Sequence, residues 1–320
     1  MSMVDLIALT SIAITLAASS VQKSVGPSGI CNGPDHAIWF AERYADRIAR
    51  ITRDGAITEF SKGITPGSEP SDVSSGPDGN MWFVEERGNR IGRLTPNGVV
   101  TEFSAGISSG AEITSITDGP DGAMWFTEAS RDRIGRITMH GSVTEFSNGI
   151  TAGSQPERIS EGPDHNLWFT ERRGDRIGRI TMSGVITEFG RGISPHSEPS
   201  DLSRGPDGAI WFTEFAGNRI GRMSLDGSVS EFNVGTADSG PASITIAADG
   251  NLWFTEAKAS RIGSITPSGK ITEFAGGLAS ASELGDITAT HDGFLWFTET
   301  RSGRIGRIDV RGHLKEFPVR

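Results

Sequence analysis

Residues 76–85, Gly-Pro-Asp-Gly-Asn-Met-Trp-Phe-Val-Glu, decide the fold because variants of this stretch recur along the whole chain. A Trp-Phe pair followed by one residue and a Glu occurs seven times and includes all 7 tryptophans, at Trp39, Trp82, Trp125, Trp168, Trp211, Trp253 and Trp296. Successive tryptophans are 43 residues apart, or 42 in one case. Repetition with this period, built from short β-rich segments, is typical of a β-propeller.

Each repeat predicts four antiparallel strands. In the second repeat, residues 76–79 and 96–98 are turn sequences, because Gly and Asn tolerate positive φ and Pro presets φ to about −65°. The segments between them are rich in Trp, Phe, Ile, Val and Thr, which favour strands. We predict an inner strand before residue 76, then a Trp-Phe strand, an Arg-Ile-Gly-Arg strand and an outer Thr-Glu-Phe strand. The chain is therefore predicted to be all-β, a seven-bladed propeller over residues 26–320 with the tryptophans buried between blades.

Composition restricts the classes of function. The repeat is uninterrupted, so the 320 residues are predicted to form a single domain that functions as a monomer. A formal net charge of −10 argues against a nucleic-acid partner and is compatible with a divalent metal or a cationic ligand. The single cysteine, Cys31, excludes an internal disulfide or a thiolate cluster. No Ser-His-Asp order, phosphate loop or paired zinc-type histidines are found, and the six histidines do not cluster in sequence.

The N-terminal residues 1–25 lie outside the repeat. Residues 6–21 carry no charge and end near small residues, which favours an export signal and hence a periplasmic or extracellular protein. The segment lacks the basic residues of a secretory leader, so an additional strand on the last blade, built on Ile12, Ile14 and Leu16, is the alternative interpretation. It is too short to predict an integral membrane domain.

Carboxylates are predicted to gather on one face, because the start of each inner strand lies beside the end of its antiparallel Trp-Phe strand. The end of that strand supplies a complete column, Glu42, Glu85, Glu128, Glu171, Glu214, Glu256 and Glu299. The segment before the inner strands adds Glu69, Glu112, Glu198 and Glu283, and the inner strands add Asp72, Asp201 and Asp286. Oxygen ligands of this kind suit Mg²⁺ or Ca²⁺.

An arginine begins the third strand of every repeat, at Arg47, Arg90, Arg133, Arg176, Arg219, Arg261 and Arg304. Pairing between Glu and Arg within each blade is therefore the structural interpretation of the glutamate column. A functional site should break the symmetry, and Glu283 with Glu299 is the least symmetric pair, since Leu284-Gly285-Asp286 replaces the usual sequence there. Other candidates for the ligand-binding face are Asp286, Glu256, and His196 close to Glu198.

The motifs Gly-Pro-Asp-Gly-x-x-Trp-Phe-Thr-Glu, Asn-Arg-Ile-Gly-Arg-Ile-Thr and Thr-Glu-Phe resemble those of the virginiamycin B lyases, also called streptogramin B lyases, a family of seven-bladed propellers. The resemblance covers nearly all of residues 26–320. It implies a small cyclic peptide as ligand and an elimination that opens the ring without water. It also implies a histidine base and Mg²⁺ as Lewis acid, with Glu283 and Glu299 at the metal positions.

The two family histidines are missing. In the family they follow Pro at the start of the last two inner strands, and here those positions are Ala242 and Gly285. The corresponding residues of the other repeats are Ser28, Ser71, Thr114, Glu157 and Ser200, so no shift of register restores a histidine. No catalytic residue is therefore assigned.

Two hypotheses remain. The first is a lyase-like enzyme that uses another base, for which Glu157, Asp286 and His196 are the available groups. The second is a binding propeller without catalysis that presents an acidic face to a peptide, glycan or protein.

Overall fold

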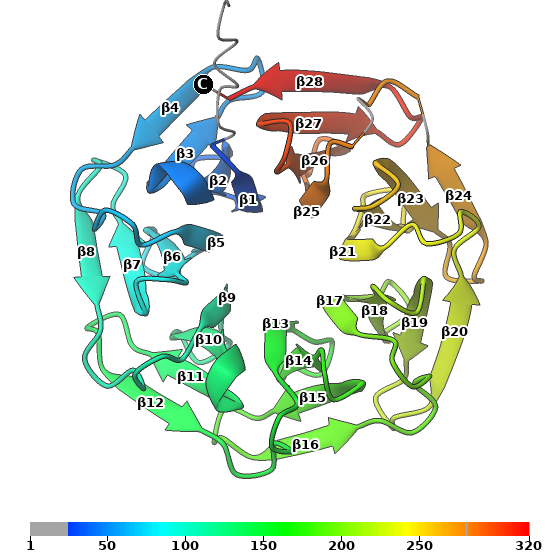
Figure 1. Cartoon of the computed structure of the whole chain (residues 1–320), viewed down its shortest axis with the longest axis horizontal. Coiled ribbons are helices and arrows are strands. Elements are labelled where there is room, and N and C mark those ends of the chain that lie inside the picture. Colours follow the sequence, from blue (N-terminus) through cyan, green and yellow to red (C-terminus); the bar gives the residue numbers. More distant parts are fainter. Residues whose placement is uncertain (1–24, 275, 279–280, 320) are drawn as a thin grey trace, which may run out of the picture.

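A computed structural model describes residues 25–274, 276–278 and 281–319. These residues form seven four-stranded antiparallel sheets arranged around a central channel (Figure 1), which confirms the predicted propeller. Each sheet consists of four consecutive strands, numbered from the channel outward. Blade 1 is β1–β4, and blade 7 is β25–β28.

The strands have the same bounds in nearly every repeat. Inner strands are β1 (Pro27–Asn32), β5 (Pro70–Ser75), β9 (Ile113–Asp118), β13 (Pro156–Glu161), β17 (Pro199–Arg204), β21 (Pro241–Ile246) and β25 (Leu284–Ala289). The Trp-Phe strands are β2 (Ile38–Glu42), β6 (Met81–Glu85), β10 (Met124–Glu128), β14 (Leu167–Glu171), β18 (Ile210–Glu214), β22 (Leu252–Glu256) and β26 (Phe294–Glu299).

The two outer positions of each blade follow the same rule. Third strands are β3 (Arg47–Ile51), β7 (Arg90–Leu94), β11 (Arg133–Ile137), β15 (Arg176–Ile180), β19 (Arg219–Met223), β23 (Arg261–Ile265) and β27 (Arg304–Asp309). Outer strands are β4 (Ile57–Phe60), β8 (Val100–Phe103), β12 (Val143–Phe146), β16 (Ile186–Phe189), β20 (Val229–Asn233), β24 (Ile271–Phe274) and β28 (Leu314–Pro318). Short 3₁₀ turns cover Arg43–Ala45 and Ala129–Arg131.

The Trp-Phe pair fills the space on both sides of each blade. Each tryptophan stacks on the phenylalanine of its own outer strand, as Trp82 does on Phe103 at 5.5 Å between ring centroids. All seven tryptophans are at most 3% exposed, as predicted. The other ring of the pair covers the Gly of the third strand, because a Cβ at Gly92 would lie 2.0 Å from the Phe83 ring. Packing therefore favours Gly at this position in six blades, whereas blade 1 carries Ala49 there.

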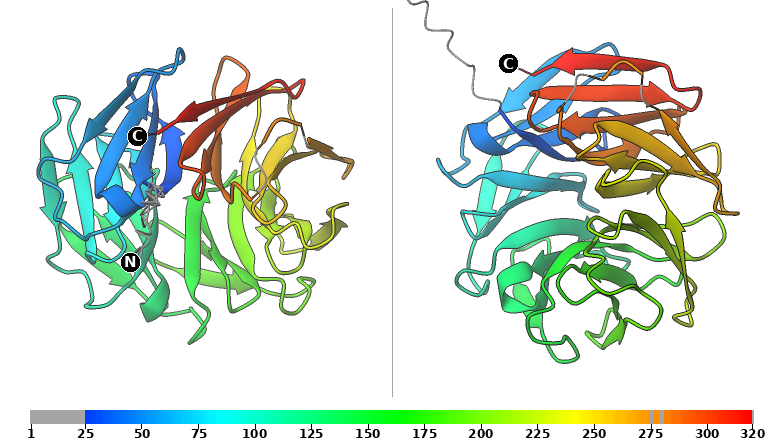
Figure 2. Two further views of the ribbon diagram at one scale, coloured as in Figure 1. Left: turned by 45° about the horizontal axis from the view of Figure 1, so that its top comes forward. Right: turned by 45° about the vertical axis from the view of Figure 1, so that its right-hand side comes forward.

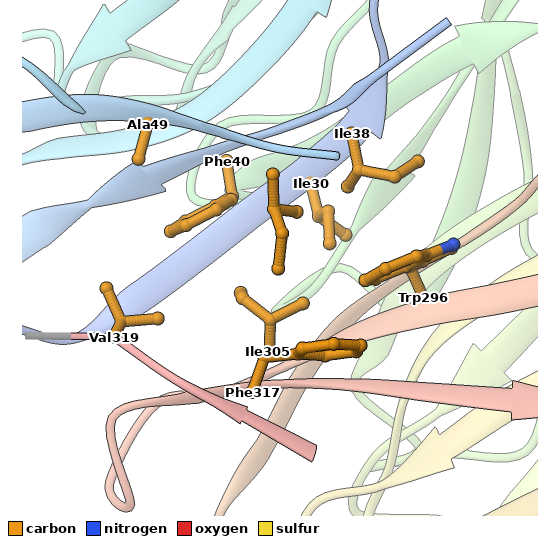
Figure 3. Close-up of a cluster of buried hydrophobic side chains, with 9 residues drawn as sticks. Ile30, Ile38, Phe40, Ala49, Trp296, Ile305, Phe317 and Val319 are labelled. Atoms are coloured by element: carbon orange, nitrogen blue, oxygen red, sulfur yellow. The ribbon is translucent and has the colours of Figure 1, made fainter. Parts of the chain in front are cut away.

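Ring closure between blades 7 and 1 uses side chains and no strand exchange within the described residues. Figure 3 shows the cluster at this seam, where Ile30 and Phe40 of blade 1 meet Trp296, Ile305 and Phe317 of blade 7. The views in Figure 2 show blades 1 and 7 adjacent around the ring. The predicted export signal or extra strand, in residues 1–25, lies almost entirely outside the described residues. None of the described residues forms a helix with the length and apolar character needed to cross a bilayer.

Candidate functional site

A cavity of about 580 Å³ opens on the face where the inner strands begin, at the axis around which the seven sheets are arranged in Figure 1. The second residue of every inner strand lines it: Ser28, Ser71, Thr114, Glu157, Ser200, Ala242 and Gly285. The volume lies in the range of small-molecule sites, about 300–1,000 Å³. The two positions that correspond to the family histidines therefore face the same cavity.

Threonines of the Trp-Phe strands fix the backbone at these positions. Thr170 Oγ1 accepts the Arg158 N–H at 3.1 Å and donates to the Ser200 carbonyl of the next blade at 3.1 Å. Thr255 Oγ1 likewise accepts from Ser243 N at 3.0 Å and donates to the Gly285 carbonyl at 2.7 Å. Each threonine thus stabilises an irregularity in the register of its own inner strand and ties that blade to the next one.

Paired charges form the wall of the cavity. Arg172 Nη1 lies 3.2 Å from Glu157 Oε1, and Arg172 Nη2 lies 3.1 Å from Glu198 Oε2. The guanidinium also lies over the Phe215 ring at 5.4 Å. Burial raises the pKa of Glu157, and the charge of Arg172 opposes this shift. These contacts hold Arg172 in one orientation at the cavity wall.

The first blade repeats this arrangement across the channel. Arg43 Nε lies 3.2 Å from Glu69 Oε2, and Arg43 Nη2 lies 2.8 Å from Glu86 Oε1. Burial raises the pKa of Glu86, again opposed by the arginine. Exposed Arg173 also lines the cavity. The wall therefore offers both acceptors and donors, and it is not uniformly acidic as the sequence suggested.

The third residue of each inner strand lines this cavity, a further channel segment, or both. This channel ring consists of Gly29, Asp72, Ser115, Arg158, Asp201, Ser243 and Asp286. Arg158 spans it, with Nη1 3.0 Å from Asp72 Oδ1 and Nη2 3.0 Å from Asp286 Oδ2. Arg158 and Asp286 also line a further channel segment of about 200 Å³, so the ring lies between the two spaces.

The acids of the channel ring also accept backbone N–H groups from neighbouring blades. Asp72 Oδ2 accepts from Ile116 N at 3.0 Å, and Asp286 Oδ2 accepts from Ile30 N at 3.1 Å. Burial would lower the pKa of Arg158, but Asp286 and Asp72 raise it well above its ordinary value. Arg158 is therefore a permanent cation inside the channel.

Asp201 and Asp286 share the hydroxyl of Ser243. Ser243 Oγ lies 2.7 Å from Asp201 Oδ2 and 2.6 Å from Asp286 Oδ1. The single hydroxyl proton of Ser243 can be donated to only one of these two carboxylates at a time. Burial raises the pKa of Asp201 to about 6; Arg158 opposes this shift and Asp286 adds to it.

The predicted candidates divide into two groups. Asp286, Glu198, Ala242 and Gly285 line the cavity. His196 and Glu256 do not: His196 is exposed in the connection before β17, where its backbone N–H donates to Asp175 Oδ2 at 2.7 Å. All six histidines are exposed, and none of them is among the described residues that line the cavity.

Glu256 belongs to the glutamate belt, which we define as the glutamates that end the Trp-Phe strands: Glu42, Glu85, Glu128, Glu171, Glu214, Glu256 and Glu299. All seven are fully buried. Burial, together with the nearby outer-strand carboxylate of Glu188, raises the pKa of Glu171 to about 8. A pKa of about 8 favours the protonated form of Glu171 at neutral pH, and the same holds for Glu85, Glu128 and Glu214. None of the belt glutamates lines the cavity.

The predicted Glu–Arg pairing is present in part of the belt. Among the described residues, the belt glutamate pairs with the arginine of its own blade at Arg47, Arg90 and Arg219. Arg133 and Arg304 pair with the outer-strand glutamates Glu145 and Glu316. The outer-strand glutamates also accept hydrogen bonds from the loop that enters their blade from the preceding one. Glu102 Oε1, for example, accepts from Thr65 N at 2.6 Å.

Glu283 and Glu299 are neighbours in the backbone but differ in environment. Glu283 is exposed with φ 54°, whereas Glu299 is fully buried and accepts from Ser302 Oγ at 2.7 Å. Burial raises the pKa of Glu299. Within the described part of the chain, no three His, Cys, Asp or Glu side chains come together as a metal site. A shared, partly hydrated Mg²⁺ does not fit this arrangement, and its assignment to these two residues stays a prediction.

Arg158 was not recognised as a site residue from the sequence, and neither were Arg43 and Arg172. A signal exists in all three cases, because each occupies a repeat position where other blades carry a different kind of side chain. The other six blades have Asp, Ser or Gly at the position that corresponds to Arg158. An alignment of the seven repeats with one another would have identified Arg158 as the one basic residue at its position.

The profile of the virginiamycin B lyase family matches residues 10–148 and 149–320. A selenomethionine-substituted virginiamycin B lyase from Staphylococcus aureus is 37% identical, with a TM-score of 0.82, covering 88% of this chain and 94% of that one. A streptogramin B lyase structure is 34% identical, with a TM-score of 0.84 and coverages of 92% and 94%.

A catalytically inactive variant of the Staphylococcus aureus virginiamycin B lyase, with quinupristin, is 36% identical. Its TM-score is 0.83, and the match covers 90% of this chain and 96% of that one. No curated protein matches the chain in sequence.

Proposed function

Because this chain belongs to the virginiamycin B lyase family, we propose that its channel cavity binds a compact peptide, such as a cyclic depsipeptide, without the family's histidine-dependent elimination. The observation that carries the proposal is the cavity itself. It has a volume of about 580 Å³ and a wall of oriented charged pairs, and the positions of the family histidines hold Ala242 and Gly285.

The wall suits a peptide better than an apolar ligand. Arg172 and Arg43 are held by two carboxylates each, so their remaining N–H groups are oriented before a ligand arrives. Such groups donate to carbonyl oxygens, while Glu157, Glu198 and the hydroxyls accept from amides. Quinupristin, the partner of a family structure, is named here only as a compound of the expected class.

Elimination would need a base in place of the family histidine. Ala242 and Gly285 have no group that accepts a proton, and losing a positioned general base typically costs a factor of about 10²–10⁴ in rate. Gly285 is also tightly enclosed, because a Cβ there would lie 2.6 Å from Thr298 Oγ1. A histidine introduced at 285 would therefore displace Thr298, and Leu284 replaces the family proline before it.

The test measures binding and turnover separately. The unmodified protein is titrated with a streptogramin B antibiotic in a calorimeter, with and without Mg²⁺, and the mixture is then examined by tandem mass spectrometry for the linear product of unchanged mass. We expect binding, no rapid formation of linear product, and affinity several-fold weaker in Arg172→Met. Arg204→Met, an exposed arginine at the far end of β17, is the matched control.

Two results would overturn the proposal. Rapid Mg²⁺-dependent linearisation by the unmodified protein would show that another group serves as base, with Glu157 or Asp286 the first to examine. Absence of binding, or equal loss in Arg172→Met and Arg204→Met, would show that the cavity does not take this class of ligand.

A further inference from the structure

A second cavity, of about 440 Å³, lies on the opposite face at the seam between blades 1 and 7. Its apolar wall includes Ile38, Ile51 and the Trp296 ring, and its polar wall includes Arg53 and His291. The arginine pairs with Asp292 of blade 7, so the polar wall bridges the two blades. Like the other interfaces between blades in the described residues, this one is held by side chains and not by a shared strand.

Trp296 differs from the other six tryptophans in its polar contact. In blades 1–6 the indole Nε1–H donates to the Asp four residues earlier, at 2.9, 3.1, 3.0, 2.9, 3.0 and 3.3 Å. Trp296 is 2% exposed, and its Nε1–H has no acceptor among the described residues, although Asp292 occupies the same relative position. Figure 3 shows its nitrogen at the end of the ring away from Phe40 and Val319.

The first residue of the turn explains this difference. In blades 1–5 it is Gly, and a Cβ at Gly33 would lie 2.1 Å from the Trp39 ring. Blade 6 carries Ala247 there and has the longest of the six indole contacts, at 3.3 Å. Blade 7 carries Thr290, whose hydroxyl bonds Asp292 and the Phe294 carbonyl. A larger side chain thus separates the indole from the turn and directs Asp292 elsewhere.

Trp296 lines the seam cavity and its indole nitrogen is not fully enclosed, so a ligand in the cavity can accept from its Nε1–H. We infer that the seam cavity is a second ligand site, which takes a small molecule that combines a planar apolar part with a carboxylate. The apolar part lies against Ile38 and Ile51, and the carboxylate accepts from Trp296 Nε1–H with Arg53 beside it.

The experiment uses the full chain labelled with ¹⁵N at tryptophan and naphthalene-2-carboxylate as the probe. The Trp296 indole resonance is assigned by its loss in Trp296→Phe. We expect the probe to shift this resonance and to leave that of Trp253 unmoved, with a Kd of about 0.1–1 mM. Naphthalene-2-methanol, which lacks the charge, is expected to bind several-fold more weakly.

Thr290→Gly restores the turn residue of blades 1–5. It removes the hydroxyl contacts to Asp292 and the Phe294 carbonyl but keeps the backbone hydrogen bond from residue 290 to Phe294. The variant should allow the Trp296 Nε1–H to donate to Asp292, and it should abolish probe binding. Ala247→Gly, the matched change in blade 6, should not affect binding. Arg53→Gln, at a largely exposed side chain, should weaken binding several-fold. Arg172→Met should have no effect, which separates this site from the channel cavity.

The inference is overturned if the probe leaves the Trp296 resonance unmoved, or shifts all seven indole resonances alike. Unchanged binding in Thr290→Gly would also overturn it. Binding that appears only after residues 1–24 are deleted would show that the chain itself occupies the cavity, and would likewise contradict a free ligand site.

Discussion

The glutamate belt and the channel ring each take one residue from every blade, but they use it in opposite ways. The belt repeats the same fully buried carboxyl group seven times, at the end of every Trp-Phe strand. The ring has Gly, Asp, Ser, Arg, Asp, Ser and Asp in order, and these residues bond to one another across the channel. Repeated positions hold blades together, whereas variable positions next to the axis form the candidate site.

The glutamate belt and the channel ring also differ in charge. Burial raises the pKa of Glu42 and Glu256 to about 7 and that of Glu85, Glu128 and Glu214 to about 8, so the belt carries protons at neutral pH. The ring instead surrounds a cation, because Arg158 pairs with Asp72 and Asp286, and its acids also accept from backbone N–H groups. The comparison predicts that neutral substitutions will be tolerated in the belt and costly in the ring.

The largest effect is expected for Arg158→Met. The substitution leaves Asp72 and Asp286 buried without their cation, and breaking a buried ion pair in this way costs about 3–5 kcal/mol. The free energy of unfolding is measured with urea at pH 7. Arg173→Met, the same change at an exposed cavity residue, should cost less than about 0.5 kcal/mol. Equal costs would contradict the role given to the ring.

Asp201→Asn should lower the free energy of unfolding by about 1–3 kcal/mol. Asp201 accepts from Leu202 N at 2.8 Å and from Ile244 N at 2.9 Å, one at each oxygen. An asparagine amide directs N–H against one of these donors in either orientation. Asp238→Asn, at an exposed carboxylate, is the control, and a cost no larger than that of the control would show that the ring tolerates neutral acceptors.

Stability should fall by at least about 1 kcal/mol from pH 5 to pH 8. The belt glutamates titrate at about 7 to 8 when folded, above the ordinary value of 4.5, so between these values the folded state holds more protons than the unfolded state. Raising the pH then favours unfolding. Urea titrations across this range provide the measurement, and a free energy that is constant or rises would contradict the protonated belt.

Glu171→Gln should have the smallest effect, under about 0.5 kcal/mol at pH 7. Glutamine keeps the shape of a protonated glutamate and can donate to Glu188 in the same way. The variant should also lose less stability between pH 5 and pH 8 than the unmodified protein. A cost comparable to that of Asp201→Asn would show that Glu171 is ionised in the folded protein.

Much of the fold was predictable from local information. The turn residues, the alternation of the strands and the spacing of Trp39 through Trp296 determined seven blades of four strands, because each repeat contains its own hydrogen-bonding partners. The absence of histidine at Ala242 and Gly285, and the face on which these positions lie, could also be read from the repeat.

Tertiary structure decided the chemistry of the side chains. Whether Glu171 carries a proton depends on Glu188 and on burial, and Arg158 acquires its role from Asp72 and Asp286 in other blades. The Trp296 indole lacks the hydrogen bond to Asp292 because Thr290 separates the turn from the ring. These contacts join residues distant in sequence, and their energies depend on distance and desolvation, which sequence spacing alone does not specify.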